Sequence, residues 1–289
     1  MANTDNNVYK LPQKAVKTID SLIYRGIRTE VFPGCQVVVL HKGDVVFDKC
    51  YGYQTYGKQL PVTDSTLYDM ASVTKAAATT LAVMKLYDEG KIKLYDTIGA
   101  YLPYLRGTDK SRIPLIELLT HTSGMPAFIP FYKKICNNCR YIAPCPSEQF
   151  SMQIADSCYL RRDYQDSVRY QIAHCKLSTK KYVYSDLNFF FLKEMVEQIT
   201  GMPMDQYLQE NFYQPMGLRY TCFNPLRNGF SKSNIAPTEL DTLFRHQVVE
   251  GYVHDQTAAL FDGDAGNAGL FSTVHQHLED GGDFAGGGE

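Results

Sequence analysis

The sequence predicts a mixed α/β (α+β) fold in which an antiparallel sheet is flanked by helices and packs against a helical region. Residues 35–41 and 45–51 are rich in β-branched side chains and flank the turn sequence Lys42-Gly43-Asp44, which is typical of a β-hairpin. Residues 73–89 are rich in Ala, Leu and Met and are followed by Gly90, as in a helix with a C-terminal glycine. With 289 residues and 44% hydrophobic content, the chain is long enough to bury a sizeable core.

Other segments also show helical patterns. The apolar residues at positions 16, 19, 22 and 23 recur at helical spacing after Pro12 and predict an amphipathic helix that ends near Gly26. The helix at 73–89 is too apolar for a surface position, so we expect it to be buried and central. Further helices are expected at residues 113–121, with Pro114 in the first turn, at 189–200, followed by Gly201, and at 204–212.

The pattern predicts one domain over residues 1–274 and a glycine-rich tail over 275–289. Within the domain, residues 128–177 combine many aromatic side chains and most of the cysteines with no clean period, which predicts an insertion or lid. The glycines of the tail cannot build a core strand or a stable helix. A domain that begins with two sheet strands needs further strands to cover them, so we expect the final strands to be missing from this chain.

The eight cysteines are unevenly spaced. Cys136 and Cys139 form a lone CxxC, and the later cysteines and His174 are irregularly spaced for a second pair of zinc ligands. We therefore expect no metal; a disulfide clip and free thiols both remain open for this segment. Cys35 and Cys50 are expected to lie opposite each other in the hairpin, where a disulfide bridge is a further alternative.

Composition excludes several classes of protein. No apolar run approaches the roughly 18 to 20 residues that span a bilayer, and the start MANTDNNVYKLPQ has neither the basic nor the apolar region of a signal peptide. As written, the chain is expected to stay in the cytoplasm. A formal charge of −2 without long Lys/Arg runs argues against nucleic-acid binding.

A Ser-x-x-Lys pair marks the start of the helix expected at 73–89. The spacing puts Ser72 and Lys75 one helical turn apart on the same face, so the amine can reach the hydroxyl and activate it for acyl transfer. At a helix N-terminus, backbone N–H groups also favour a developing oxyanion. The simpler alternative is that Ser72 only caps the helix. Ser178 and Lys181 repeat the spacing in a polar stretch, and we interpret that match as chance.

Residues 68–75 (YDMASVTK) resemble the nucleophile motif of class C β-lactamases, low-molecular-weight penicillin-binding proteins and related esterases. Other family blocks follow in the family's order at residues 118–126, 184–186, 215–218 and 266–273, so that the resemblance spans about residues 10–274. The sequence is therefore similar to the serine β-lactamase and penicillin-binding-protein superfamily. This resemblance implies a β-lactamase/transpeptidase-like fold.

The resemblance also implies roles for individual residues. Ser72 is the nucleophile, Lys75 its proton partner, and Tyr184 shuttles protons between them and the leaving group. The family usually has Asn where this chain has Asp186, so Asp186 is a candidate substrate-binding residue. Its charge keeps the Lys75 amine protonated unless the carboxylate points away. Asn188 is the alternative source of the missing amide.

The family's third element, Lys-Thr-Gly or His-x-Gly on a core strand, is not found. Residues 121–124 (HTSG) precede Tyr184, and residues 267–269 (NAG) match another block. The simplest account is a fragment, or an altered C-terminus, that lacks the last strands and helix. Loss of one oxyanion donor costs roughly 2.7 to 4 kcal/mol of transition-state stabilisation.

Other catalytic motifs are weak or absent. His254 and Asp255 invite a Ser-His-Asp interpretation, but we prefer a structural loop because Ser72, Lys75 and Tyr184 already supply a base. The sequence has no Gly-x-Ser-x-Gly, His-Glu-x-x-His or phosphate-binding glycine loop.

The expected function is therefore two-step acyl transfer by a β-lactamase-related serine hydrolase, without a cofactor. Its substrate is expected to be a β-lactam, a D-Ala-D-Ala peptide or a small ester, and a D,D-peptidase or esterase is the second choice. The alternative from another class is a catalytically incomplete binding or accessory module of a larger envelope protein. The resemblance implies a periplasmic or cell-envelope location and a peptidoglycan-like partner, and it leaves the oligomeric state open.

Overall fold

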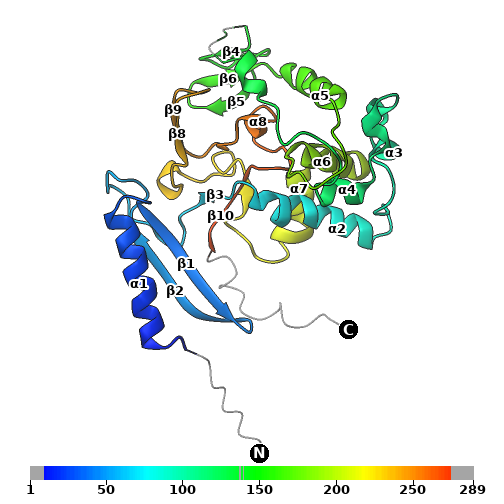
Figure 1. The fold of residues 1–289 in the computed structure, drawn as a ribbon. Coiled ribbons are helices and arrows are strands. Elements are labelled where there is room, and N and C mark those ends of the chain that lie inside the picture. The colour runs from blue at the N-terminus through cyan, green and yellow to red at the C-terminus, as the bar shows by residue number, and fades with distance from the viewer. Residues whose placement is uncertain (1–9, 137, 139, 275–289) are drawn as a thin grey trace, which may run out of the picture.

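The computed structural model describes residues 10–136, 138 and 140–274, and its N-terminal elements lie to one side of the remaining ones (Figure 1). Helix α1 (Gln13–Arg28) runs beside the hairpin of β1 (Gly34–His41) and β2 (Asp44–Gly52). Asp20 of α1 accepts hydrogen bonds from Lys49 Nζ at 2.8 Å and from the Tyr51 hydroxyl at 2.6 Å. The helix and hairpin expected at this end are confirmed, and these polar contacts tie them together.

The expected pairing of Cys35 with Cys50 is wrong. The turn pairs His41 with Asp44, and in an undisturbed ladder this start would bring the two cysteines opposite each other. A register shift at Val39/Leu40 moves every earlier pair by one residue, so Cys35 lies opposite Tyr51 instead.

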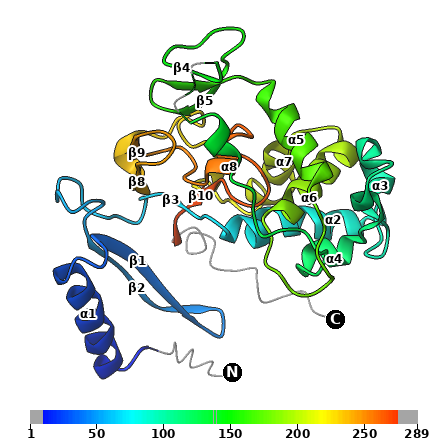
Figure 2. The ribbon, with the colours of Figure 1, turned by 45° about the horizontal axis from the view of Figure 1, so that its top comes forward.

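The remaining strands form small separate antiparallel sheets, whereas the sequence predicts one antiparallel sheet. The sheet nearest the candidate nucleophile has β10 (Leu270–Ser272) between β3 (Tyr68–Asp69) and β7 (Cys222–Phe223). Figure 2 shows β3 and β10 between the N-terminal hairpin and the helices. The other strands are β4 (Ile142–Ala143), β5 (Met152–Ala155), β6 (Cys158–Leu160), β8 (Glu239–Asp241) and β9 (Gln247–Val249).

The helix expected at 73–89 is present but only half-buried. It begins with a π-helical segment (Lys75–Thr80) and continues as α2 (Leu81–Asp88). Ala82 and Leu86 are fully buried, whereas Met84 is 59% exposed on the opposite face. The helix that is buried over most of its length is instead α6 (Leu187–Thr200), which ends at Gly201 in the left-handed conformation.

The other expected helices are also present, with shorter α-helical cores. These are α4 (Leu115–Leu119), which Pro114 precedes, and α7 (Met204–Leu208), which continues as a π-helical segment (Gln209–Tyr213). Further helices are α3 (Ile98–Tyr101), α5 (Tyr164–His174) and α8 (Gln256–Ala259), with 3-10 turns at Pro103–Leu105, Asp109–Arg112, Phe131–Lys134 and Lys232–Asn234.

The cysteine-rich segment 128–177 contains β4, β5, β6 and α5. Phe131, Met152, Leu160 and Val168 of this segment are buried in the main core. Its sequence shows no single period because short strands, a 3-10 turn and a helix follow one another within it. Its status as an insertion or lid, like the domain limits, stays a prediction.

The cysteines of this segment give no sign of a metal site in the described part of the chain. There, no three His, Cys, Asp or Glu side chains gather in a metal-binding arrangement. Cys136, Cys145, Cys158 and Cys175 are free thiols, and Cys139 lies outside the described residues. Burial raises the pKa of Cys158 to about 11, which makes it a poor nucleophile.

None of the helices in residues 10–136, 138 and 140–274 is both long and apolar enough to cross a bilayer. Residues 275–289, for which the sequence predicts a glycine-rich tail, lie outside the described residues.

Candidate active site

Ser72 and Lys75 meet at the start of the helix, as their spacing predicts. Lys75 Nζ donates to Ser72 Oγ at 2.9 Å and to the backbone carbonyl of Asn267 at 3.1 Å. It also forms an ion pair with Asp186 Oδ1 at 2.7 Å. Ser72 is exposed, whereas Lys75 is only 5% exposed. The hydroxyl can therefore meet a substrate while the amine stays enclosed.

The backbone N–H groups at this helix start are mostly occupied. Those of Val73, Thr74 and Lys75 donate to the carbonyls of Met70, Ala71 and Ser72, respectively. The N–H of Ser72 itself has no acceptor among the described residues. Of this group of donors, the Ser72 N–H is thus the one available to an oxyanion on an acylating carbonyl.

Asp69 anchors the turn that presents Ser72. Ala71 has φ +45°, an unusual conformation for a residue with a Cβ, and its N–H donates to Asp69 Oδ1 at 2.8 Å. The other carboxylate oxygen accepts from the His254 backbone at 2.8 Å and lies 3.0 Å from His254 Nδ1. The side-chain hydrogen bond between the Asp69 carboxylate and the His254 ring raises the pKa of His254. The Asp69 side chain is fully buried, so it joins the strained turn to a distant loop.

The glycine-rich segment 263–269 lies against the helix that carries Ser72. Thr79 Oγ1 donates to the Gly266 carbonyl at 2.7 Å, and the neighbouring Asn267 carbonyl accepts from the Lys75 amine. Gly269 has φ +121°, and a Cβ there would lie 1.9 Å from a backbone oxygen across the loop. The block at 266–273 thus contributes a carbonyl to the site, and only glycine fits at position 269.

Tyr184 and Asp186 also lie close to the Lys75 amine. The Tyr184 ring centroid is 4.9 Å from Lys75 Nζ, and the residue is 44% exposed. Its hydroxyl makes no hydrogen bond to any described residue. The Asp186 carboxylate points toward Lys75 and forms an ion pair with its ammonium group. The orientation away from Lys75, which the sequence left open, is not observed. The structure thus brings Ser72, Lys75, Tyr184 and Asp186 together.

The alternative that Asn188 supplies the missing amide is not supported by its contacts. Asn188 is fully buried on α6, accepts from Ser123 Oγ at 2.7 Å and donates to the Leu118 carbonyl at 3.1 Å. Both groups of its side-chain amide are hydrogen-bonded to residues in and after α4, so they are not available to the Ser72 site.

His121 is the neighbour of the site that the sequence did not reveal. Its ring stacks on the Tyr184 ring with centroids 4.4 Å apart and planes at 30°. Its Nδ1 accepts a hydrogen bond from the Ser185 backbone N–H at 3.0 Å. The sequence block at residues 118–126 predicts a turn at this position, but it does not indicate which residues the turn contacts.

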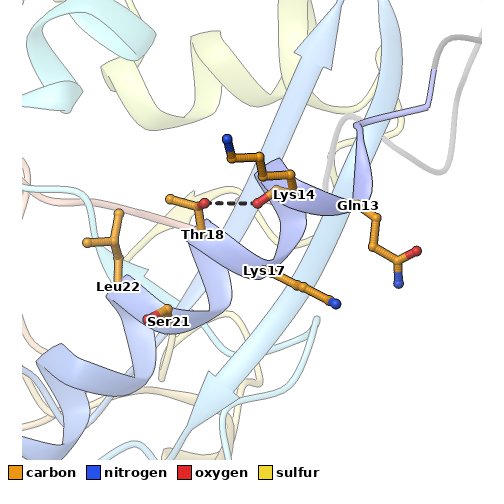
Figure 3. Close-up of a pocket in the computed structure, with 6 residues that line it drawn as sticks. All are labelled: Gln13, Lys14, Lys17, Thr18, Ser21 and Leu22. Atoms are coloured by element: carbon orange, nitrogen blue, oxygen red, sulfur yellow. Dashed lines mark hydrogen bonds between the residues drawn. The ribbon is translucent and has the colours of Figure 1, made fainter.

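Among the described residues, the serine, histidine and aspartate of the weaker motifs make no hydrogen bond to Ser72, Lys75, Tyr184 or Asp186. Ser178 Oγ donates to the Gly124 carbonyl at 3.1 Å, in line with a chance match. His254 pairs with Asp69, and Asp255 accepts from the Ala258 N–H at 2.6 Å as the cap of α8, so both have structural partners. Figure 3 shows a hollow on α1 that is lined entirely by residues of that helix, among them Lys17, and the Ser72 site does not contribute to it.

Comparisons with known proteins decide the family. A family model described as Beta-lactamase matches residues 19–277. The chain belongs to the β-lactamase family. This β-lactamase-family chain is 32% identical over 292 residues to a Bacillus subtilis protein named N-acetylmuramyl-L-alanine amidase, covering 90% of the chain and 60% of the relative. It is 33% identical over 270 residues to a Salmonella schwarzengrund protein named provisionally as a D-alanyl-D-alanine carboxypeptidase, covering 84% of the chain and 58% of the relative.

Solved structures of the β-lactamase family share the fold. An octameric penicillin-binding protein homologue from Pyrococcus abyssi has a TM-score of 0.66 at 22% identity, covering 90% of this chain and 54% of that one. A class C β-lactamase also has a TM-score of 0.66, at 21% identity, covering 92% of this chain and 63% of that one. The β-lactamase/transpeptidase-like fold is thereby confirmed, and the chain spans about 60% of the length of these relatives.

Proposed function

We propose that this chain is a serine hydrolase that transfers an acyl group through an ester on Ser72. The observation that carries the proposal is the 2.9 Å contact between Lys75 Nζ and the exposed Ser72 Oγ. An enclosed amine next to an accessible hydroxyl is the arrangement that activates a weak nucleophile.

The proposed reaction has two steps. Ser72 Oγ bonds to the substrate carbonyl carbon while its proton passes to the Lys75 amine in its neutral form. The bond from that carbon to the leaving nitrogen or oxygen then breaks, and the leaving atom takes the proton from Lys75, with Tyr184 as the relay. In the second step, water or an amine bonds to the acyl carbon and gives a proton to the Lys75 amine. The bond from that carbon to Ser72 Oγ breaks, and Oγ takes the proton back from Lys75.

The proposed substrate is a β-lactam, a D-Ala-D-Ala peptide or a small ester. Two relatives carry names that refer to cell-wall amide bonds, which favours a peptidoglycan-like substrate and an envelope location. A D,D-peptidase or esterase is the second candidate within the same chemistry, because the constellation of Ser72, Lys75 and Tyr184 does not choose among acyl donors.

A binding or accessory module is the alternative from another class. It is favoured by the ion pair between Lys75 and Asp186, because a charged amine donates to Ser72 and cannot take its proton.

Intact mass spectrometry after incubation with a fluorescent penicillin, and separately with a fluorophosphonate, tests the proposal. We expect an adduct on the parent chain that is absent from Ser72→Ala and retained in Ser178→Ala, which removes the serine of the chance motif. A folded parent without an adduct from either reagent would refute acyl transfer at Ser72 and favour the binding module.

A further inference from the structure

His121 contacts three consecutive residues of the segment that carries Tyr184. Its carbonyl accepts from the Val183 N–H at 2.9 Å, and its Nδ1 accepts from the Ser185 N–H at 3.0 Å. Between these two bonds, its ring stacks on the Tyr184 ring at 4.4 Å. The Phe189 ring lies on it at 5.5 Å, tilted by 38°. One residue thus fixes both the backbone and the ring of this segment.

The backbone of His121 is itself in a demanding conformation. It follows the end of α4 with φ +57°, which costs free energy for any residue with a Cβ. Histidine, asparagine and aspartate adopt this conformation more readily than most residues. The bonds to the backbone of residues 183 and 185 add to those within the turn itself, and few side chains suit both the turn and these contacts.

The contact with Ser185 fixes the protonation state of the ring. An imidazole nitrogen that accepts a hydrogen bond carries no proton, so the ring is neutral with its proton on Nε2. Burial, and then the positive charge of Lys75, lower the pKa of His121, against the opposing effect of Asp186. Protonation of Nδ1 would place two donors face to face and add a second cation beside the ammonium group.

We infer that neutral His121 is a positioning residue of the Ser72 site, which holds Tyr184 against Lys75 through its contacts with residues 183–185. This inference rests on the proposed acyl transfer for its consequence, because Tyr184 is the proposed proton relay. His121 does not touch a reacting atom itself. It acts through Tyr184, and its protonation releases that residue.

Two substitutions separate the functions of the ring. His121→Asn keeps an oxygen that accepts from the Ser185 N–H and tolerates positive φ, but it does not titrate. His121→Phe keeps a ring on Tyr184 but loses the acceptor. The matched control is His174→Asn, because His174 also stacks on a tyrosine, Tyr170, at 4.1 Å on the surface of α5.

The first readout is the rate constant for labelling Ser72 with fluorophosphonate between about pH 5 and pH 9. For the parent we expect an acid limb below the usual histidine range, which His174→Asn retains and His121→Asn loses. His121→Asn should also be slower at about pH 8, because it removes the ring that stacks on Tyr184. His121→Phe should be slower at every pH, by about 10- to 100-fold, because the relay is misplaced. An unchanged acid limb in His121→Asn, or a full rate in His121→Phe, would overturn the inference.

The second readout does not depend on activity. In nitrogen NMR spectra of the labelled ring, we expect unprotonated Nδ1, a pKa below the ordinary value of about 6.5, and an upward shift of that pKa in Lys75→Ala. The Ser185 amide signal should titrate together with the ring. A protonated Nδ1 at neutral pH, or an ordinary pKa, would refute the positioning role even in an inactive chain. Failure of parent labelling with the expected NMR result would instead refute only the acyl transfer.

Discussion

Lys75 and Asp186 form an ion pair in which Nζ lies 2.7 Å from Oδ1 and only 6% of the lysine side chain is exposed. The ammonium group has three N–H donors, and it contacts three acceptors: the Asp186 carboxylate, Ser72 Oγ and the Asn267 carbonyl. The resting site is therefore complementary to a charged amine. Only a neutral amine can take the proton of Ser72, and a neutral amine would no longer form the ion pair with Asp186.

Asp186→Asn is expected to raise the rate of Ser72 labelling at neutral pH. The substitution keeps the shape of the side chain, removes the charge that pairs with the ammonium group, and introduces the amide usual in the family. An increase of about tenfold corresponds to about 1.4 kcal/mol in activation free energy. Fluorophosphonate labelling rates measure it.

Asp163→Asn is the matched control for this change. Asp163 precedes α5 as Asp186 precedes α6, and it pairs with Arg161 on the surface. The rate of Ser72 labelling in Asp163→Asn should equal that of the parent. A fall of the Asp186→Asn rate to the level of Ser72→Ala would mean that the negative charge promotes activation instead.

Asp69→Ala is expected to destabilise the chain and slow labelling together. It leaves the partly buried N–H of Ala71 without its acceptor, at a cost of about 1 to 3 kcal/mol in unfolding free energy, and it releases the turn before Ser72. Denaturant unfolding and labelling rates measure the two effects. Asp96→Asn is the control, because Asp96 stabilises another loop by accepting hydrogen bonds from the Lys93 N–H and the Tyr101 hydroxyl. Equal loss of rate in Asp69→Ala and the control would show that the turn is not held by Asp69.

Local contacts of this site could be predicted from spacing, and the positions of Tyr184 and Asp186 near Lys75 could be predicted from the family resemblance. The other long-range contacts could not be predicted. The contact between Ser72 and Lys75 follows from helical spacing alone, because the helix places residues three apart on one face. The contacts between Asp69 and His254, and between Lys75 and Asn267, join residues far apart in the chain. Nothing in residue types or spacing specifies them.

The same division holds for the fold. The helix α6 could be predicted because its apolar period and Gly201 are local signals. The partner of Cys35 could not, because one extra residue at Val39/Leu40 shifts the register without any signal in turn sequence or composition. The half-exposed position of α2 also depends on neighbours that are distant in the sequence.

The buried carboxyl group of Asp264 is expected to make stability depend on pH. Burial raises the pKa of Asp264 to about 7, although Lys193 at 3.9 Å opposes this shift. Between the unfolded value of about 3.9 and about 7, the folded chain binds more protons than the unfolded one, so stability falls as pH rises through this range. Thermal unfolding midpoints at several pH values measure the fall.

Asp264→Asn should flatten this dependence, whereas Asp262→Asn, which alters an ion pair with Arg227 nearby, should leave it unchanged. If the parent and Asp264→Asn show the same slope between about pH 4 and pH 7, Asp264 is not the group that titrates.

Gly269→Ala is expected to be among the most destabilising single changes in the chain. At φ +121° an alanine is strained, and its Cβ would lie 1.9 Å from the Gly263 carbonyl oxygen, so the loop must open. A loss of about 3 kcal/mol or more in unfolding free energy is expected.

Gly107→Ala is the matched control, since Gly107 has φ +85° and no atom within 4 Å of the added Cβ. It should lose only the backbone cost of about 1 to 2 kcal/mol. Equal losses in the two variants would mean that the loop at 263–269 is open enough to accept a side chain, and that glycine is needed there for its conformation alone.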